Sequence, residues 1–195
     1  GVSEDLKYAL RESIELLGNE AMRYLIERNL ANYTGARSIS PDDLSRECLR
    51  YMYRLLFLFY IEARPELGYA PMTAKTYLQG YSLETLRELE MIPLTSEEDR
   101  NGRYLHDSLE MLFRLVREGY SGGAKMQSDW VTEDRISIHD SQFKIPRLES
   151  HLFAAENTPI LNRVVFRNET LKQVIQSMSL SRPSKGRFSR RGRIS

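Results

Sequence analysis

Cysteine is almost absent from the sequence: Cys48 is the only one among 195 residues. A single cysteine excludes a disulfide bond within the chain. Its neighbours Leu44, Leu49 and Met52 are apolar, which is the setting of a small buried hydrophobic residue rather than of a reactive thiol. A chain that does without disulfides suits a reducing compartment, so we expect a cytoplasmic protein.

Long apolar runs are also absent. The longest one, Leu55–Ile61, has seven residues, whereas a helix that crosses a bilayer needs roughly 18. The opening residues Gly1–Asp5 lack the basic stretch followed by an apolar one that marks a signal peptide. We therefore expect no insertion into a membrane.

The motifs of a complete active site are missing as well. Neither phosphate-binding glycine motif, G-x-x-x-x-G-K-[ST] or G-x-G-x-x-G, is present, and Tyr120-Ser121-Gly122 is only a superficial approach to a serine nucleophile elbow. The three histidines His106, His139 and His151 have no second histidine or cysteine at a metal-ligand spacing. We therefore expect no catalytic residue, no bound cofactor and no metal site in this chain.

Residues 182–195, called the basic tail below, contain no acid. Their six cations are Arg182, Lys185, Arg187, Arg190, Arg191 and Arg193. Without these six the net charge of +1 becomes −5 for residues 1–181. Cations spaced by Gly, Ser and Pro can follow a phosphate backbone, and Phe188 among them can stack on a base. We name the six cations as candidate DNA-backbone contacts; the alternative is a solvated charged run that binds nothing.

Hydrophobic residues make up 41% of the chain, enough for a core, and their spacing predicts a mainly α fold. We expect a helical bundle of about five helices with a small β-hairpin and the basic tail. The helices are expected from Glu4 to Leu25, from Pro41 to Arg64, from Leu83 toward Pro93, from Arg103 to Tyr120 and from Asn168 to Met178.

The second of these helices carries the strongest signals. Ser40 is a capping residue, Pro41 suits the first helical position, and two acids follow in the first turn. Its centre, Tyr53–Ile61, is apolar on nearly every side, which predicts a helix surrounded by others at the axis of the core. Ile136 and Ile138 alternate with polar residues, as do Phe143 and Ile145, and this predicts a hairpin near residues 135–146.

Several segments together resemble part of a known family. They are ECLRYMYRLLFLFYIEARPELGY (Glu47–Tyr69), YSLETLREL (Tyr81–Leu89), YLHDSLEMLFRLVREGY (Tyr104–Tyr120), FKIPRLESHLF (Phe143–Phe153), TPILNRVVFRN (Thr158–Asn168) and RRGRIS (Arg190–Ser195). In this order they resemble the helical region that precedes the catalytic core of type IIG-like adenine-specific DNA methyltransferases. The resemblance covers about residue 46 to the end, and its strength lies in the shared order of the segments.

The resemblance implies that residues 1–181 are a helical bundle domain cut from a larger protein and that 182–195 form a linker toward a methyltransferase core. Such enzymes of restriction–modification and phage-defence systems transfer a methyl group from S-adenosylmethionine to N6 of a flipped adenine. Their cores use a glycine-containing cofactor motif and N-P-P-[YF]; Asn157–Ile160 is the nearest approach to the latter and lacks its second proline and its aromatic residue. S-adenosylmethionine is therefore expected for the parent protein and not for this chain.

These observations favour a non-catalytic spacer that positions the core and assists DNA binding. Its expected partners are double-stranded DNA and other modules or subunits of the same system. The main alternative is a helical protein-interaction or structural module with no DNA role. A self-contained enzyme of another type is the third possibility, and it would need a pocket whose polar groups the sequence does not reveal.

Overall fold

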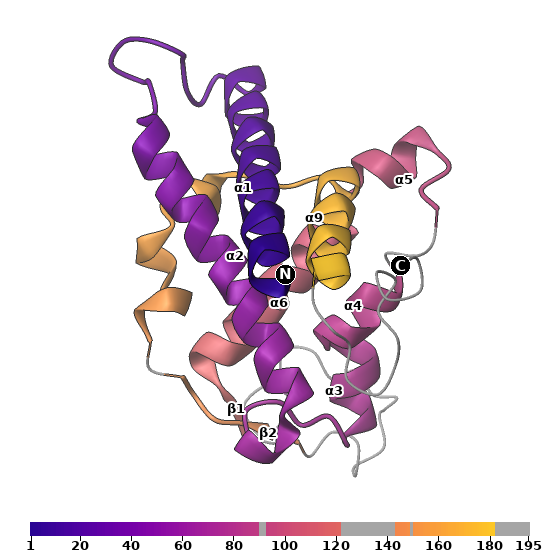
Figure 1. Ribbon diagram of the computed structural model, residues 1–195. Helices are drawn as coiled ribbons and strands as arrows, with labels where there is room; N and C mark the ends of the chain where they lie inside the picture. The colour runs from indigo at the N-terminus through magenta and orange to yellow at the C-terminus, as the bar shows by residue number, and fades with distance from the viewer. Residues whose placement is uncertain (90–92, 122–142, 149, 182–195) are drawn as a thin grey trace, which may run out of the picture.

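The structure, a computed structural model, describes residues 1–89, 93–121, 143–148 and 150–181. Within these ranges the protein is mainly helical, with one two-stranded antiparallel sheet, which confirms the predicted fold class (Figure 1). No helix in these ranges is long and apolar enough to cross a membrane.

All five predicted helices are present. They are α1 (Val2–Glu27), α2 (Pro41–Ala63), α4 (Leu83–Leu89), α6 (Tyr104–Glu118) and α9 (Asn168–Ser181). The described part of the chain adds two short helices that periodicity did not predict, α3 (Lys75–Gly80) and α5 (Glu97–Asn101). Among the described residues four 3-10 turns lie between the helices: η1 (Pro65–Leu67), η2 (His151–Phe153), η3 (Ala155–Asn157) and η4 (Leu161–Arg163).

The start of α2 follows the predicted local chemistry. Ser40 has an extended backbone and its Oγ accepts a hydrogen bond from the Asp43 N–H at 3.3 Å. This bond satisfies one of the helix's first N–H groups, and Pro41 has no N–H to satisfy. The helix then supplies buried residues along its whole length, among them Cys48, which is fully buried as expected.

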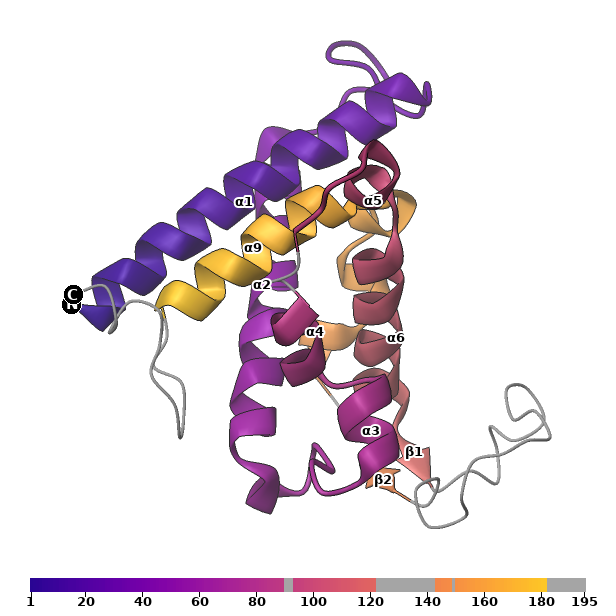
Figure 2. The same cartoon turned by 90° about the vertical axis from the view of Figure 1, so that its right-hand side faces the viewer.

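The helices pack in two directions. Figure 2 shows α1 and α9 side by side and inclined to α2 and α6, and α1 contacts both α9 and α2. Tyr51 of α2 lies at the centre of the core, with its ring 5.3 Å from that of Phe113 on α6 and 5.3 Å from that of Phe166 just before α9. Three segments far apart in sequence therefore meet at one aromatic cluster.

The prediction that α2 is surrounded on every side is wrong in one respect. Tyr53 is 44% exposed and Tyr60 is 49% exposed, although both lie within the apolar centre of the helix. Tyrosine tolerates this position because its hydroxyl makes the side chain amphipathic, so it can be part buried and part in water. One side of α2 therefore faces solvent, and the helix lies at an edge of the bundle (Figure 1).

The small sheet pairs β1 (Tyr120–Ser121) with β2 (Lys144–Ile145), Tyr120 opposite Ile145. The predicted second strand is thus present, and its partner among the described residues directly follows α6. Residues 136–138, predicted as the first strand, and the predicted turn at 139–142 lie outside the described residues. Alternation of polar and apolar residues identifies a strand but not its partner. Here the buried Phe143 packs on the Tyr120 ring at 4.7 Å, a contact that local patterning does not reveal.

Gly119 joins α6 to β1 and has no room for a side chain. Its φ is +77°, and a Cβ atom there would lie 2.9 Å from both the Arg147 nitrogen and the Ile145 oxygen. We expect Gly119→Ala to lower the free energy of unfolding by about 2 kcal/mol, because strained φ and backbone contact act together. Gly18→Ala within α1, where nothing lies within 4 Å of the new Cβ, is the control. Urea denaturation should show Gly18→Ala to be at least as stable as the unmodified protein and Gly119→Ala to be less stable. An equal loss of stability in both variants would contradict the special role of Gly119.

Candidate functional site

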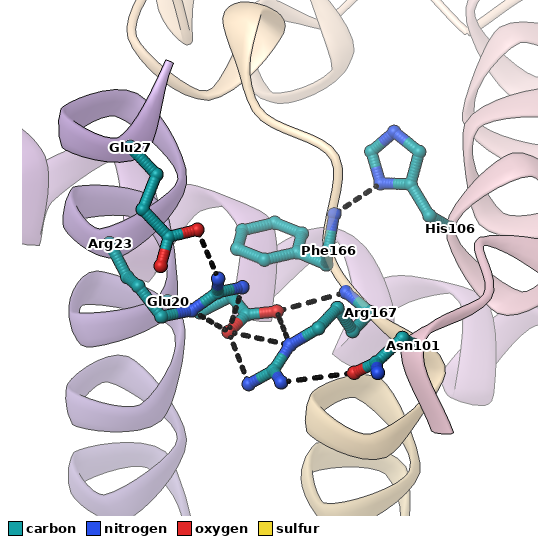
Figure 3. A network of polar contacts seen from close by, with 7 residues as sticks. All are labelled: Glu20, Arg23, Glu27, Asn101, His106, Phe166 and Arg167. Carbon is teal, nitrogen blue, oxygen red and sulfur yellow. Dashed lines mark hydrogen bonds and ion pairs between the residues drawn. The ribbon is translucent and has the colours of Figure 1, made fainter. Parts of the chain in front are cut away.

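A buried carboxylate on α1 holds the residue that precedes α9. Glu20 is 4% exposed, and its two oxygens accept hydrogen bonds from Arg167: the backbone N–H at 3.0 Å, Nε at 2.9 Å and Nη2 at 2.9 Å (Figure 3). Arg23 adds a bond to the same carboxylate at 3.1 Å, and Arg167 Nη1 donates to Asn101 Oδ1 at 3.2 Å. We call these four residues, Glu20, Arg23, Asn101 and Arg167, the α9 anchor.

The electrostatics of the α9 anchor favour the ionised pair. Burial by itself raises the pKa of the Glu20 carboxyl, but hydrogen bonds from Arg167 and Arg23 outweigh it and hold this pKa below its usual value. The hydrogen bond with Glu20 in turn raises the pKa of Arg167. The carboxylate therefore stays charged at neutral pH and serves as a fixed acceptor rather than as a proton donor.

The two residues on either side of Arg167 bind α6 and the segment before it. The Phe166 N–H donates to His106 Nδ1 at 3.3 Å, and burial lowers the pKa of this histidine, so it acts as a neutral acceptor. Asn168 Oδ1 accepts from the Leu105 N–H at 2.9 Å, and the Asn168 N–H donates to the Gly102 carbonyl at 2.8 Å. Residues 166–168 thus tie α9 to α1, α5 and α6 at one point.

A second set of buried charges lies on α2 and binds the irregular segment 150–161. Glu47 Oε1 accepts from the backbone N–H groups of Ile160 and Leu161 at 2.8 and 2.9 Å. Arg54 Nε donates to the Leu152 carbonyl at 2.7 Å. Because this segment carries 3-10 turns and little regular hydrogen bonding of its own, the side chains of α2 satisfy backbone groups that would otherwise be buried without partners.

A third buried charge, Glu62, lies near the end of α2. It binds the junction between α3 and α4, called the α3–α4 corner below. One of its carboxylate oxygens accepts from Tyr77 Oη at 2.6 Å and from the Leu83 N–H at 2.7 Å, and the other accepts from the Glu84 N–H at 2.8 Å. Burial raises the pKa of Glu62 to about 7 in spite of these three donors. The same burial raises the pKa of the Tyr77 hydroxyl, which therefore remains a donor.

These groups hold the fold together; they do not form a reactive constellation. Each buried charge is bound by backbone groups or by a counter-charge of the chain itself, which is how structural polar groups are satisfied. Burial raises the pKa of Cys48 to about 12, so it is an unreactive thiol at neutral pH. In the part of the chain that the structure describes, no three His, Cys, Asp or Glu side chains gather as a metal site requires.

Ser121 lies at the end of the short strand β1. The run Gly119–Gly123 satisfies the letters of G-x-S-x-G, but a nucleophile elbow places its serine on the turn from a strand into a helix. Here Ser121 is the last residue of β1, paired with Lys144, and the residues that would form the turn after it, 122–142, lie outside the described residues.

The structure leaves the predicted tail contacts untested and reveals sites that the sequence reasoning missed. Arg182, Lys185, Arg187, Arg190, Arg191 and Arg193 all lie outside the described residues. The buried charges of α2 carried a signal: Glu47, Arg54 and Glu62 lie seven and eight residues apart, among the buried positions of the helix. Charges at helical spacing on an apolar face indicate buried polar contacts. Glu20 and Arg167, 147 positions apart, gave no such signal.

Comparison with known proteins identifies no relative: no family model, no curated protein and no solved structure matches the chain.

Proposed function

We propose that this chain is a non-catalytic helical region of an S-adenosylmethionine-dependent adenine-N6 DNA methyltransferase, in a cytoplasmic restriction–modification or phage-defence system. In this role it positions the catalytic core and helps to hold double-stranded DNA. The observation that supports it is the way α9 is fixed, since this helix ends at Ser181 and the basic tail follows directly in sequence.

A positioning region has to define where the next module begins. The α9 anchor binds the start of α9 to α1, and α1 then packs along α9 (Figure 2). A helix of 14 residues is about 21 Å long, so fixing its start and one side also fixes its far end. The buried charges of α2 make the connecting segment 150–161 part of the same framework. The basic tail that leads toward the core therefore starts from a fixed point of the bundle.

The basic tail supplies the DNA contacts in this proposal. Arginines at these spacings bind phosphate oxygens, which gives affinity and register but carries no direct sequence information. Target recognition and methyl transfer then belong to other modules of the parent protein, with S-adenosylmethionine as the cofactor of its core.

We expect the chain to bind duplex DNA with a strong salt dependence. Six phosphate contacts give a slope of log K against log salt of about −5, and replacing three tail arginines by alanine should reduce its magnitude by about 2.7. Fluorescence anisotropy over a salt series, with several unrelated duplexes, measures both effects. The tail variant replaces Arg187, Arg190 and Arg191 by alanine. The matched bundle variant replaces three exposed arginines of the bundle, Arg11, Arg37 and Arg114.

The bundle variant should keep the slope of the unmodified chain, and the tail variant should weaken all duplexes alike. A slope near zero for the unmodified chain, or loss of discrimination at one base pair only, would contradict the DNA role and favour a protein-interaction module. The gene sequence after Ser195 tests the other half of the proposal: a glycine-containing cofactor motif and N-P-P-[YF] should follow, and an immediate stop codon would overturn it.

A further inference from the structure

The solvent-facing side of α2 carries a single row of arginines and aromatic residues. Arg46, Arg50, Tyr53, Phe57 and Tyr60 follow one another along the helix, and Arg64 comes directly after its last residue; we call these six the α2 stripe. The spacings alternate between four and three residues, so the five positions within α2 fall on one face of the helix. With a rise of 1.5 Å per residue, Arg46 to Tyr60 span about 21 Å.

One ring of the α2 stripe is held between neighbouring rings, and the other two are accessible. Phe57 is half-buried, and its ring centre lies 6.4 Å from that of Tyr69 and 5.6 Å from that of Phe153. Tyr53 and Tyr60 stand on either side of it and expose 44% and 49% of their surface. Exposed aromatic rings on a packed helix offer flat surfaces whose position is already fixed.

The charges of the α2 stripe favour an anionic partner. The stripe itself contains no acid. The two acids between Arg46 and Arg64 in sequence, Glu47 and Glu62, are both buried, and Glu47, on which Arg50 acts electrostatically, is bound by the backbone of Ile160 and Leu161. Arg46 pairs with Asp43 at 3.2 Å, but both side chains are largely exposed, and such a pair is weak enough for a phosphate to compete with it.

The other two arginines are oriented by neighbouring groups. Arg50 Nη1 donates to the Asn157 carbonyl at 2.9 Å, and the Arg64 guanidinium lies 5.6 Å from the centre of the Tyr60 ring. Glu66, which is exposed in η1, is the acid that follows the stripe in sequence. Cations at both ends and accessible rings between them match a strand with a charged backbone and flat, unpaired bases.

We propose that the α2 stripe binds single-stranded nucleic acid, with Tyr53 and Tyr60 stacking on bases and the three arginines contacting phosphates. Duplex DNA offers the same phosphates but keeps its bases stacked inside, so the tyrosines add affinity only for a single strand. This surface belongs to the bundle and is separate in sequence from the basic tail. The inference does not depend on the proposed methyltransferase function.

The test measures binding of dye-labelled oligothymidine and of a duplex of equal length to the full chain by fluorescence anisotropy. All six tail cations are replaced by alanine in every sample, so that the tail cannot mask the stripe. We expect the Tyr53→Ala, Tyr60→Ala double variant to bind oligothymidine at least about ten-fold more weakly. Duplex affinity, which reports phosphate contacts alone, should change by less than about two-fold.

Two control variants separate stacking from folding and from general surface effects. Tyr8→Ala with Tyr33→Ala removes two tyrosines that are 70% and 75% exposed elsewhere, and it should leave the affinity for oligothymidine unchanged. Tyr53→Phe with Tyr60→Phe keeps both rings and should retain that affinity. Circular dichroism and urea denaturation of each variant confirm that helix content and stability are kept.

Three results would each overturn the inference. The first is no binding of oligothymidine by the tail-neutralised chain. The second is an equal loss of oligothymidine affinity in the Tyr53→Ala, Tyr60→Ala variant and in the Tyr8→Ala, Tyr33→Ala variant. The third is an equal loss of affinity for oligothymidine and for the duplex in the Tyr53→Ala, Tyr60→Ala variant. If oligothymidine is not bound while duplex binding by the unmodified chain shows the salt slope given above, the inference fails and the proposed DNA role of the tail stands.

Discussion

Replacing Glu62 by alanine is expected to lower the free energy of unfolding by about 4 kcal/mol. The carboxylate accepts hydrogen bonds from Tyr77 Oη and from the N–H groups of Leu83 and Glu84. Alanine leaves a buried hydroxyl and two N–H groups at the start of α4 without their acceptor, and it leaves a cavity at the end of α2. Urea denaturation near pH 6 measures the loss.

Tyr77→Phe is the matched control, because it removes one donor and leaves the carboxylate with two. Its expected cost is about 1 kcal/mol, that of a single hydrogen bond. If Tyr77→Phe cost as much as Glu62→Ala, the two N–H groups of α4 would contribute nothing and the α3–α4 corner would not depend on Glu62 in the way the geometry indicates.

The pH dependence of stability provides an independent measurement at Glu62. Burial raises the pKa of its carboxyl from the unfolded value of 4.5 to about 7 in the folded protein, so the folded state binds the extra proton between these values. The resulting stabilisation is complete below about pH 4.5 and is lost as pH rises through about 7, by about 3 kcal/mol in all. Glu62→Gln carries no titrating group, so its stability relative to the unmodified protein should rise between pH 5 and 8.

The difference between the two stability curves is the quantity to compare, because other groups titrate equally in both proteins. Parallel curves for the unmodified protein and Glu62→Gln over this range would contradict the raised pKa. A difference of the opposite sign would mean that the three donors outweigh burial and that the pKa of Glu62 is lowered.

The parts of the fold that the sequence predicted are those governed by local rules. Helix starts such as Ser40-Pro41 and helix ends such as Gly119 depend on residues a few positions apart, and the apolar spacing of α6 is a property of one segment. These features were predicted with their positions nearly correct. The short helices α3 and α5, of six and five residues, are too brief for a periodic pattern to indicate them.

The polar framework depends on contacts that no local pattern encodes. Glu20 lies on α1 among residues that read as an ordinary amphipathic helix, and nothing near it indicates that its partner is Arg167. The charges Glu47, Arg54 and Glu62 on α2 were visible in the sequence, but the apolar centre of that helix dominated the interpretation. The exposed positions Tyr53 and Tyr60 were missed for the same reason, since tyrosine counts as apolar in periodicity and yet serves at a surface.

The α9 anchor leads to the second large stability effect. We expect Glu20→Ala to lower the free energy of unfolding by about 3 kcal/mol, because it leaves the Arg167 N–H and guanidinium without their main acceptor. This loss of stability is smaller than that expected for Glu62→Ala. The Arg167 side chain is 31% exposed, so water can replace part of the lost interaction. Chemical denaturation at neutral pH measures this loss.

Glu27→Ala is the matched control on the same helix. Glu27 also pairs with Arg23, at 2.8 Å, but its side chain is 55% exposed, and such surface pairs contribute about 0.5 kcal/mol or less. Equal losses for Glu20→Ala and Glu27→Ala would show that burial and the bond to the Arg167 backbone add nothing. Unequal losses in the expected order would locate the stabilisation in the α9 anchor rather than in the charge of α1.

The acid side of the stability curve separates Glu20 from Glu62. Hydrogen bonds from Arg167 and Arg23 hold the folded pKa of Glu20 below its unfolded value of 4.5, so its stabilisation is complete above that value and is lost as pH falls through the folded pKa. The difference in free energy of unfolding between the unmodified protein and Glu20→Gln should therefore shrink below pH 4.5. In that range the contribution of Glu62 to stability is constant. Hydrogen exchange at pH 7 should show the first turn of α9 opening in Glu20→Gln while the start of α4 stays protected, because only α9 begins at this carboxylate.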